Sequence, residues 1–451
     1  MDFTLGLLRG FVGLAAILGI ALLFSEHWRQ TNWRMVGWGL VMQIALAILI
    51  LKGDAMGAAF APLGWPKALF SWLSSLFVLL LKFTTAGAQF VLGDIALPPE
   101  GGIAPGTPLV SGQSWGNAIA FQVLPTIIFF GALMAILYHL GIMQRVVQAM
   151  ARLVTKLLNS SGAESLSVSA NVFVGQTEAP LVIRPYLQNM TRSEFMAVMS
   201  GGMATMAGGV IAAYIVFLAG PFAAVQGIPV EAAQLRFAEH LLGASLMAAP
   251  AALVLAKILV PETGQPVTLG QVSLPVSTDF KNVIDAAANG AGAGMKLVIN
   301  IAAMLIAFIA LIALADYIVG WTGDLVGLEL TLGQILGWAF APVAWLIGVP
   351  MTDVTQFGSL LGIKVVANEF VAYLQMAELL GTNELSPKSI LMATFALCGF
   401  ANFSSIAIQI GGIGPLAPEC KSTLAELGLK AVLAGTLANL MTATIAGVLA
   451  S

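Results

Sequence analysis

Charged side chains are scarce in this chain of 451 residues, where Asp, Glu, Lys and Arg together make up 9% of the sequence. A typical soluble domain carries about a quarter of such residues. The formal net charge is −3 and the basic residues are scattered, so there is no basis for a nucleic-acid partner. With 59% apolar residues and a mean hydropathy of +0.93, the composition predicts an integral membrane protein whose solvent is the lipid bilayer.

Cysteine and histidine are also rare. Cys398 and Cys420 are the two cysteines, and there are three histidines. The two cysteines form no CxxC pair and give no disulfide framework, and so few histidines do not support a zinc site. The sequence therefore gives no indication of redox or zinc chemistry.

Long apolar stretches are what the chain has in abundance. About 20 helical residues cross a hydrocarbon core of about 30 Å. Stretches of this length begin near residues 4, 35, 116, 195, 238, 297, 388 and 429. They predict an all-α polytopic membrane protein with about eight transmembrane helices. The first stretch lacks a basic start and a cleavage site, so we expect a retained span, which favours a bacterial inner membrane.

Three segments fit poorly as simple spans. Residues 67–92 carry lysine, serine and threonine at irregular spacing, and we expect them to lie partly along the membrane surface. Residues 142–158 are basic and amphipathic, which is typical of an interfacial helix. Residues 276–296 are rich in alanine and glycine, and we expect a small-residue helix on the cytoplasmic side.

Two further stretches, residues 160–189 and 353–381, are apolar but broken in the middle by a polar cluster. Each leaves arms of roughly 12 to 17 residues, which rise only about 18 to 25 Å in a helix and cross the membrane poorly. We therefore predict two re-entrant hairpins with polar tips.

The first tip contains Gln176, Thr177 and Glu178 in succession. Consecutive helical residues point about 100° apart, so these three side chains converge only at a turn, which Pro180 supports. With Thr177 as the N-cap, Glu178 falls in the first helical turn, where free N–H groups favour a carboxylate. The second tip repeats the device, with Asn368 as the cap and Glu369 as the first helical residue.

Each hairpin precedes an apolar helix that small or polar residues interrupt: "MSGGMATMAGG" at 199–209 and "ALCGFANFSS" at 396–405. Three span-like segments separate the two units, so the second unit enters the membrane from the opposite face. We expect scaffold spans and a surface helix in residues 1–115, followed by inverted-repeat units at 116–260 and 276–451. Matching breaks in two halves point to a transporter site near the midplane.

The polar residues of these units have less specific interpretations too. A charge at the bilayer centre costs at least about 2.5 kcal/mol, so the two glutamates have a partner or a task, unless both tips reach water and the glutamates only cap helices. Asn402 and Ser405 share a helix face and serve either as contacts between helices or as ligand contacts. Asn171 either joins helices or lends an oxygen to a cation. The stretch 199–209 is either a close-packing face or an opened backbone.

The stretches "GQTEAPLVIRPYL", "NEFVAYL" and "LCGFANFSSIAIQIGG" closely resemble the concentrative nucleoside transporter family, in order and spacing over roughly residues 115 to 450. The resemblance implies a homotrimeric secondary transporter with eight spans and two oppositely oriented hairpins. It also implies an elevator-like movement of a transport domain against a fixed scaffold.

By the same resemblance, several residues would bind the nucleoside. The residues that contact the nucleobase would be Gln176, Thr177, Glu178 and Val210. Those that bind the ribose or pack near it would be Glu369, Asn402, Ser405 and Phe400. Carboxylates and amides are suitable partners for the hydroxyl, N–H and carbonyl groups of a neutral ligand.

The resemblance also implies a sodium site with oxygen ligands from Asn171, the Val174 carbonyl, Thr205 and the Met206 carbonyl. The expected function is sodium-coupled nucleoside symport, and the alternative is proton coupling through Glu178 or another carboxylate. Two rivals from other classes are a membrane enzyme that uses the paired glutamates as acid and base, and a channel. No nucleophile, metal cluster or phosphate loop accompanies the glutamates, which argues against the enzyme.

Overall fold

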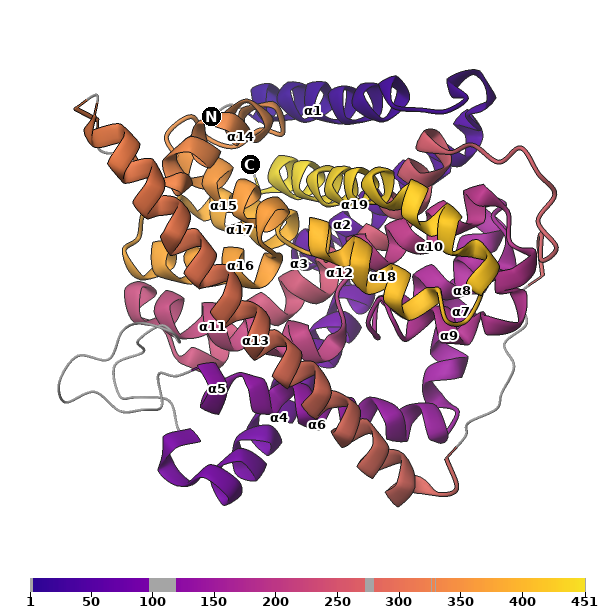
Figure 1. The fold of residues 1–451 in the computed structure, drawn as a ribbon, viewed down its shortest axis with the longest axis horizontal. Helices are drawn as coiled ribbons and strands as arrows, with labels where there is room; N and C mark the ends of the chain where they lie inside the picture. The colour runs from indigo at the N-terminus through magenta and orange to yellow at the C-terminus, as the bar shows by residue number, and fades with distance from the viewer. Residues whose placement is uncertain (1–2, 97–118, 272–279, 326, 329, 451) are drawn as a thin grey trace.

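The computed structural model describes residues 3–96, 119–271, 280–325, 327–328 and 330–450 (Figure 1). Within these ranges the regular structure is helical, apart from an isolated antiparallel bridge between Ser161 and Leu269. The predicted unit boundaries at residues 115/116 and 276, and the predicted start of the third span near residue 116, lie outside the described residues.

The helices have the following bounds: α1 (Phe3–Leu23), η1 (Trp28–Gln30), α2 (Trp33–Leu51), α3 (Gly53–Ala59), α4 (Ala61–Leu92), η2 (Gly93–Ala96), α5 (Ile119–Gln122), α6 (Leu124–His139), α7 (Ile142–Leu158), α8 (Gly162–Asn171), α9 (Ala179–Val182), η4 (Arg184–Asn189), α10 (Arg192–Ala204), α11 (Gly208–Gln226), α12 (Val230–Leu259), α13 (Val283–Asp324), α14 (Leu332–Leu346), α15 (Val354–Val366), α16 (Glu369–Gly381), α17 (Pro387–Ala396), α18 (Phe403–Ile413), η5 (Pro418–Cys420) and α19 (Lys421–Leu449).

Among the described residues, seven helical segments are long and apolar enough to cross a membrane, or up to eight if the bent pair α6 and α7 counts as one. This agrees with the predicted number of about eight. The most central of them are α12 and α19, whose apolar windows are 89% and 78% buried inside the protein, whereas the window of α13 is 6% buried. The core therefore lies around α12 and α19, and α13 runs diagonally across the outside (Figure 1).

The segment that was expected to lie along the surface is part of α4, one continuous helix of 32 residues with the length and hydropathy of a span. Two of its polar residues, Lys67 and Ser71, are paired with Glu239. Lys67 Nζ lies 2.6 Å from Glu239 Oε2, and Ser71 Oγ donates to Glu239 Oε1 at 2.5 Å. An internal ion pair lowers the cost of a charge in an apolar helix, so Lys67 is compatible with a span. How this segment lies relative to the membrane stays a prediction.

The small-residue helix predicted at 276–296 forms from Val283 onward, but it continues without a break into the span that was expected to begin near residue 297. Residues 283–324 form one helix of 42 residues, α13, whose N-cap Asn282 accepts a hydrogen bond from Asp285 N at 2.9 Å. The glycines do not break the helix, because they serve its packing against α6. A Cβ at Gly290 would meet the backbone of Gly131, so the two helices approach closely at this point.

The predicted interfacial helix at 142–158 forms as α7 with the same bounds, and the chain bends by 79° between α6 and α7. Gly141 makes this bend with a φ of 74°. Each predicted hairpin folds as two helical pieces that meet at its polar tip, α8 with α9 and α15 with α16. Their insertion from opposite membrane faces stays a prediction.

Candidate functional site

The first hairpin tip is an open turn. The arm α8 begins with a capping box, in which Ser161 and Glu164 satisfy each other's backbone N–H groups, and ends at Asn171. The predicted N-cap at Thr177 is wrong, because α9 begins at Ala179 with Glu178 in the N-cap position. The N–H groups of Glu178 and Ala179 both bond to the Gly175 carbonyl, and this turn shifts the helix start by one residue. The Glu178 side chain makes no cap bond and is exposed.

Gln176 connects this tip to α18. Its Nε2 donates to Ser405 Oγ at 3.2 Å, and its Oε1 accepts from Gln409 Nε2 at 3.0 Å. Gln409 Nε2 also donates to the Met199 carbonyl at 3.0 Å. A carbonyl can only accept, so Met199 fixes which end of the Gln409 amide is the donor, and Gln409 in turn fixes the amide of Gln176. The Nε2 group of Gln176 is therefore the end that faces Ser405.

The second hairpin tip is closed and buried. Asn368 is the N-cap of α16, and its side chain accepts from Val371 N at 2.9 Å, which confirms the predicted cap. Glu369 is the first helical residue, as predicted, and is 5% exposed. Its Oε1 accepts from Tyr214 Oη at 3.0 Å and its Oε2 from Asn402 Nδ2 at 3.0 Å. A buried carboxylate with two donors has its desolvation cost partly offset.

Both predicted weak helices are broken. The second opens between α17 and α18, where Gly399 adopts a φ of 85°. Asn402 is the N-cap of α18, and its Oδ1 accepts from Ser405 N at 3.0 Å and from Ser404 Oγ at 2.7 Å. Asn402 and Ser405 thus come together as a helix cap and its first turn, and the Asn402 amide group is free to reach Glu369.

The first weak helix opens between α10 and α11, so the opened backbone at 199–209 is the interpretation that holds. Thr205 is the C-cap of α10 and donates to the Gly201 carbonyl at 2.8 Å, and Met206 N donates to Ser245 Oγ at 3.3 Å. Gly208 N donates to the Phe173 carbonyl at 3.0 Å. This last bond ties the break directly to the first hairpin tip.

Asn171 is 1% exposed at the end of α8, on the same stretch of chain that bonds the break. Its Nδ2 donates to the Ser167 carbonyl at 3.1 Å, whereas its Oδ1 has no hydrogen-bond partner. Buried amide oxygens are rarely left unpaired in folded proteins. This oxygen is therefore available to an additional ligand.

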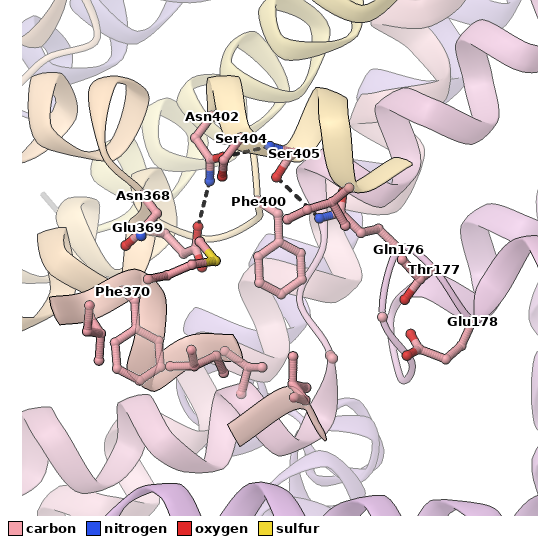
Figure 2. A pocket seen from close by; sticks show the side chains of 18 residues that line it. Gln176, Thr177, Glu178, Asn368, Glu369, Phe370, Phe400, Asn402, Ser404 and Ser405 are labelled. Carbon is pink, nitrogen blue, oxygen red and sulfur yellow. Dashed lines mark hydrogen bonds between the residues drawn. The ribbon is translucent and has the colours of Figure 1, made fainter. Parts of the chain in front are cut away.

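A pocket lies between the two tips, and the Phe400 ring points into it (Figure 2). The eight residues predicted to contact a nucleoside all line it: Gln176, Thr177, Glu178, Val210, Glu369, Phe400, Asn402 and Ser405. One wall is apolar and comes from α13, with Leu297, Ile301, Met304 and Leu305. The lining includes two carboxylates and no lysine or arginine, so the pocket suits a neutral ligand with several hydroxyl or N–H groups.

Sequence reasoning missed three buried residues that bond either to the pocket lining or to the second break. Tyr214 donates to Glu369, Gln409 orients Gln176, and Lys364 donates to carbonyls of the second break. Helical spacing offered a signal for two of them, because Tyr214 lies four residues after Val210 and Gln409 lies four residues after Ser405. Lys364 was visible as a charge inside an apolar hairpin arm.

Comparison with known proteins identifies the family. Residues 12–95 and 240–447 match the N-terminal and C-terminal parts of the Na+ dependent nucleoside transporter family, and residues 120–221 match a family described as "Nucleoside recognition". The "Nucleoside permease NupC" of Helicobacter pylori is 40% identical over 97% of this chain and 96% of its own length. The chain belongs to the concentrative nucleoside transporter family.

Members of this family are transporters, so the enzyme interpretation is dropped. An "Uncharacterized transporter YutK" of Bacillus subtilis is 44% identical over 98% of this chain and 99% of its own length. "Sodium/nucleoside cotransporter 1" of Mus musculus is 36% identical over 98% of this chain, which spans 64% of the mouse protein. The fold matches that of "CNTnw in an inward-facing substrate-bound state", with 40% identity, 98% of each chain covered and a TM-score of 0.84.

Proposed function

We propose that this protein is a sodium-coupled nucleoside symporter that works by elevator-like alternating access in a bacterial inner membrane, as a homotrimer. The observation that carries the proposal is one pocket lined by both hairpin tips and by the backbone break that Asn402 caps. The elements are those expected of a midplane transporter site, where opened helices present polar groups to a substrate. In this scheme residues 1–115 belong to the scaffold, and the units 116–260 and 276–451 supply one hairpin each.

The chemistry of the pocket favours a nucleoside over a nucleotide. Glu369 and Asn402 already share one hydrogen bond, and together they offer acceptors and donors for vicinal ribose hydroxyls. Gln176 and Thr177 can meet the polar edge of a base, while Phe400 and Val210 supply apolar contacts. A phosphate group would require cationic partners, and the lining contains none.

Sodium is the cotransported ion in this proposal, and the residues near the first break fit it. The buried Asn171 Oδ1 lacks a partner, and Thr205 stands at the C-terminal end of α10. Helix C-termini carry partial negative charge and free carbonyls, which favour a cation. The carbonyls of Val174 and Met206 would complete a set of hard oxygen ligands. Binding there would order the first tip and thereby favour nucleoside binding.

Proton coupling is the second candidate, and one observation favours it. Glu178 is exposed and makes no cap bond, so its carboxyl is accessible to solvent while it lines the pocket. In that case protonation of Glu178 would replace sodium as the event that closes the first tip.

The decisive experiment is uptake of labelled uridine and adenosine by proteoliposomes with sodium and proton gradients imposed separately. Accumulation against a nucleoside gradient that needs sodium and stops in choline supports the proposal. Accumulation driven by a proton gradient in choline would replace sodium coupling with proton coupling. Equilibration without accumulation under either gradient would favour the channel, and the size of cross-linked species in the membrane tests the trimer.

A further inference from the structure

Lys364 is a buried ammonium group in α15, the first arm of the second hairpin, and it is 1% exposed. Its Nζ donates to the Ala396 carbonyl at 2.8 Å, the Cys398 carbonyl at 2.7 Å and Asn439 Oδ1 at 2.8 Å. Three acceptors match the three donors of an ammonium, whereas a neutral amine has only two. Among the described residues no carboxylate forms an ion pair with it.

Two of these acceptors belong to the end of a broken helix. Ala396 is the last residue of α17, and Cys398 lies in the opened segment before α18. Carbonyls at a helix C-terminus lack intrahelical partners and carry the negative end of the helix dipole. Lys364 therefore caps the C-terminus of α17 from another part of the chain, with a full positive charge.

The first broken helix ends at the same place in the protein. Gly399 packs so closely against the Ala204 carbonyl, at the end of α10, that a Cβ there would collide with it. Asn439 of α19 stands between the two ends, because its Oδ1 accepts from Lys364 and its Nδ2 donates to the Ala204 carbonyl at 2.7 Å. Two carbonyl-rich helix ends thus meet, and Lys364 supplies the positive charge between them.

We propose that Lys364 is a tethered cation. Its ammonium group binds the carbonyl-rich end of the second broken helix, as the transported sodium binds the oxygen ligands at the first. This inference rests on the proposed function for the role of sodium. Because Lys364 binds the start of the second break and Glu369 binds Asn402 at its end, the second hairpin holds that break at both ends. The second half of the site is thus formed without a dissolved ion. The two breaks together take up one sodium ion per protomer, not two.

The test replaces the tethered charge with a mobile one in the full-length purified protein. Lys364→Ala leaves room for a small cation among the three acceptors. We expect uridine affinity at low sodium to fall by about tenfold or more, which corresponds to about 1.4 kcal/mol. Methylammonium chloride should restore the affinity, whereas choline chloride should not. The Hill coefficient for sodium in uridine binding should rise above the wild-type value, because a second sodium now enters.

The matched control is Lys67→Ala, which removes another buried lysine whose partner is Glu239. In that variant methylammonium should not change the uridine affinity, and the Hill coefficient for sodium should stay at the wild-type value. A second variant, Lys364→Met, fills the space without charge and should lose affinity that no amine restores. If Lys364→Met binds uridine as the wild type does, or if Lys364→Ala responds to methylammonium no more than Lys67→Ala does, the proposal is overturned.

The wild-type sodium titration separates the two proposals. Uridine binding by the wild type that is indifferent to sodium would reject sodium coupling. The change in uridine affinity of Lys364→Ala on adding methylammonium tests the role of the Lys364 charge alone, whatever the sodium titration of the wild type shows.

Discussion

The two hairpin tips carry the same kind of residue in different surroundings. Glu178 is exposed and makes no cap bond, and the helix that follows it, α9, is 4 residues long. Glu369 is buried, accepts from Tyr214 and Asn402, and begins a helix of 13 residues. A tip with a fixed network costs little to organise when a ligand arrives, whereas an open tip must be ordered first. We therefore expect ion-dependent closure at the first tip and recognition by a preformed network at the second.

The largest expected effect comes from disrupting the second hairpin tip, whose hydrogen-bond network is already formed. Glu369→Gln keeps the shape but turns one of the two acceptors into a donor, which then faces either the Tyr214 hydroxyl or the Asn402 Nδ2 group. Asn402→Ala removes the amide that donates to Glu369 Oε2. We expect either variant to abolish nucleoside uptake, with a loss of about 100-fold or more, while the trimer still assembles. Uptake at the wild-type rate in either variant, measured in proteoliposomes, would reject the proposed ribose contact.

The next largest effect concerns the proposed sodium site beside the first hairpin tip, which is open. Thr205→Val removes one proposed sodium ligand and preserves the side-chain shape, so the sodium concentration for half-maximal uridine binding should rise about tenfold. Uridine affinity at saturating sodium should change little. Thr205→Ser keeps the hydroxyl and is the control. An unchanged sodium dependence in Thr205→Val would remove this residue from the ion site.

A smaller effect is expected from the residue that orients the first tip. Gln409→Met retains the length of the side chain but no longer donates to Gln176 Oε1, so the amide of Gln176 can turn over. Gln409→Met also removes the hydrogen bond to the Met199 carbonyl, but only the bond to Gln176 orients a pocket residue. Loss of that bond costs about 1 kcal/mol, so the KM for uridine should rise about fivefold with the sodium dependence unchanged. Should Gln409→Met shift the sodium dependence instead, Gln409 would belong to the ion-coupled closure of the first tip.

The smallest effect concerns the base of the second hairpin, where Asp353 accepts from Ser386 N at 3.0 Å and Ser386 Oγ at 2.6 Å. Burial alone would raise the pKa of Asp353, but hydrogen bonds from Ser386, Ser389 and Thr352 outweigh it, so the pKa lies below the ordinary value. A carboxyl with a lowered pKa in the folded state stabilises the fold above its unfolded pKa of about 3.9, and this contribution is lost as the pH falls through the lowered value.

Asp353→Asn should therefore lower the free energy of unfolding by about 1 kcal/mol at pH 7. The difference from the wild type should shrink as the pH drops below about 4. Thermal unfolding in detergent over a pH series measures this, with Ser386→Ala as the partner variant. A difference that does not depend on pH would mean that the Asp353 charge adds nothing to the second hairpin.

Much of the site was predictable because its signals are local. The cap at Asn368 and the helix start at Glu369 follow from residue preferences within one turn, and the structure confirms both. The N-cap at Thr177 was wrong by one residue, because a turn closed on the Gly175 carbonyl competes with the cap. The helix 283–324 was divided in prediction, since its glycines look like a break until α6 is packed against them.

The sequence by itself determined the membrane class, the number of apolar stretches, the two polar tips and the two weak helices, because composition and short-range pattern carry that information. Only the tertiary structure decided which buried polar groups meet. Gln176 and Gln409 are 233 residues apart, and Lys364 and Asn439 are 75 apart. Such partners are selected by the packing of whole helices, which brings together the few donors and acceptors that an apolar interior cannot leave unpaired.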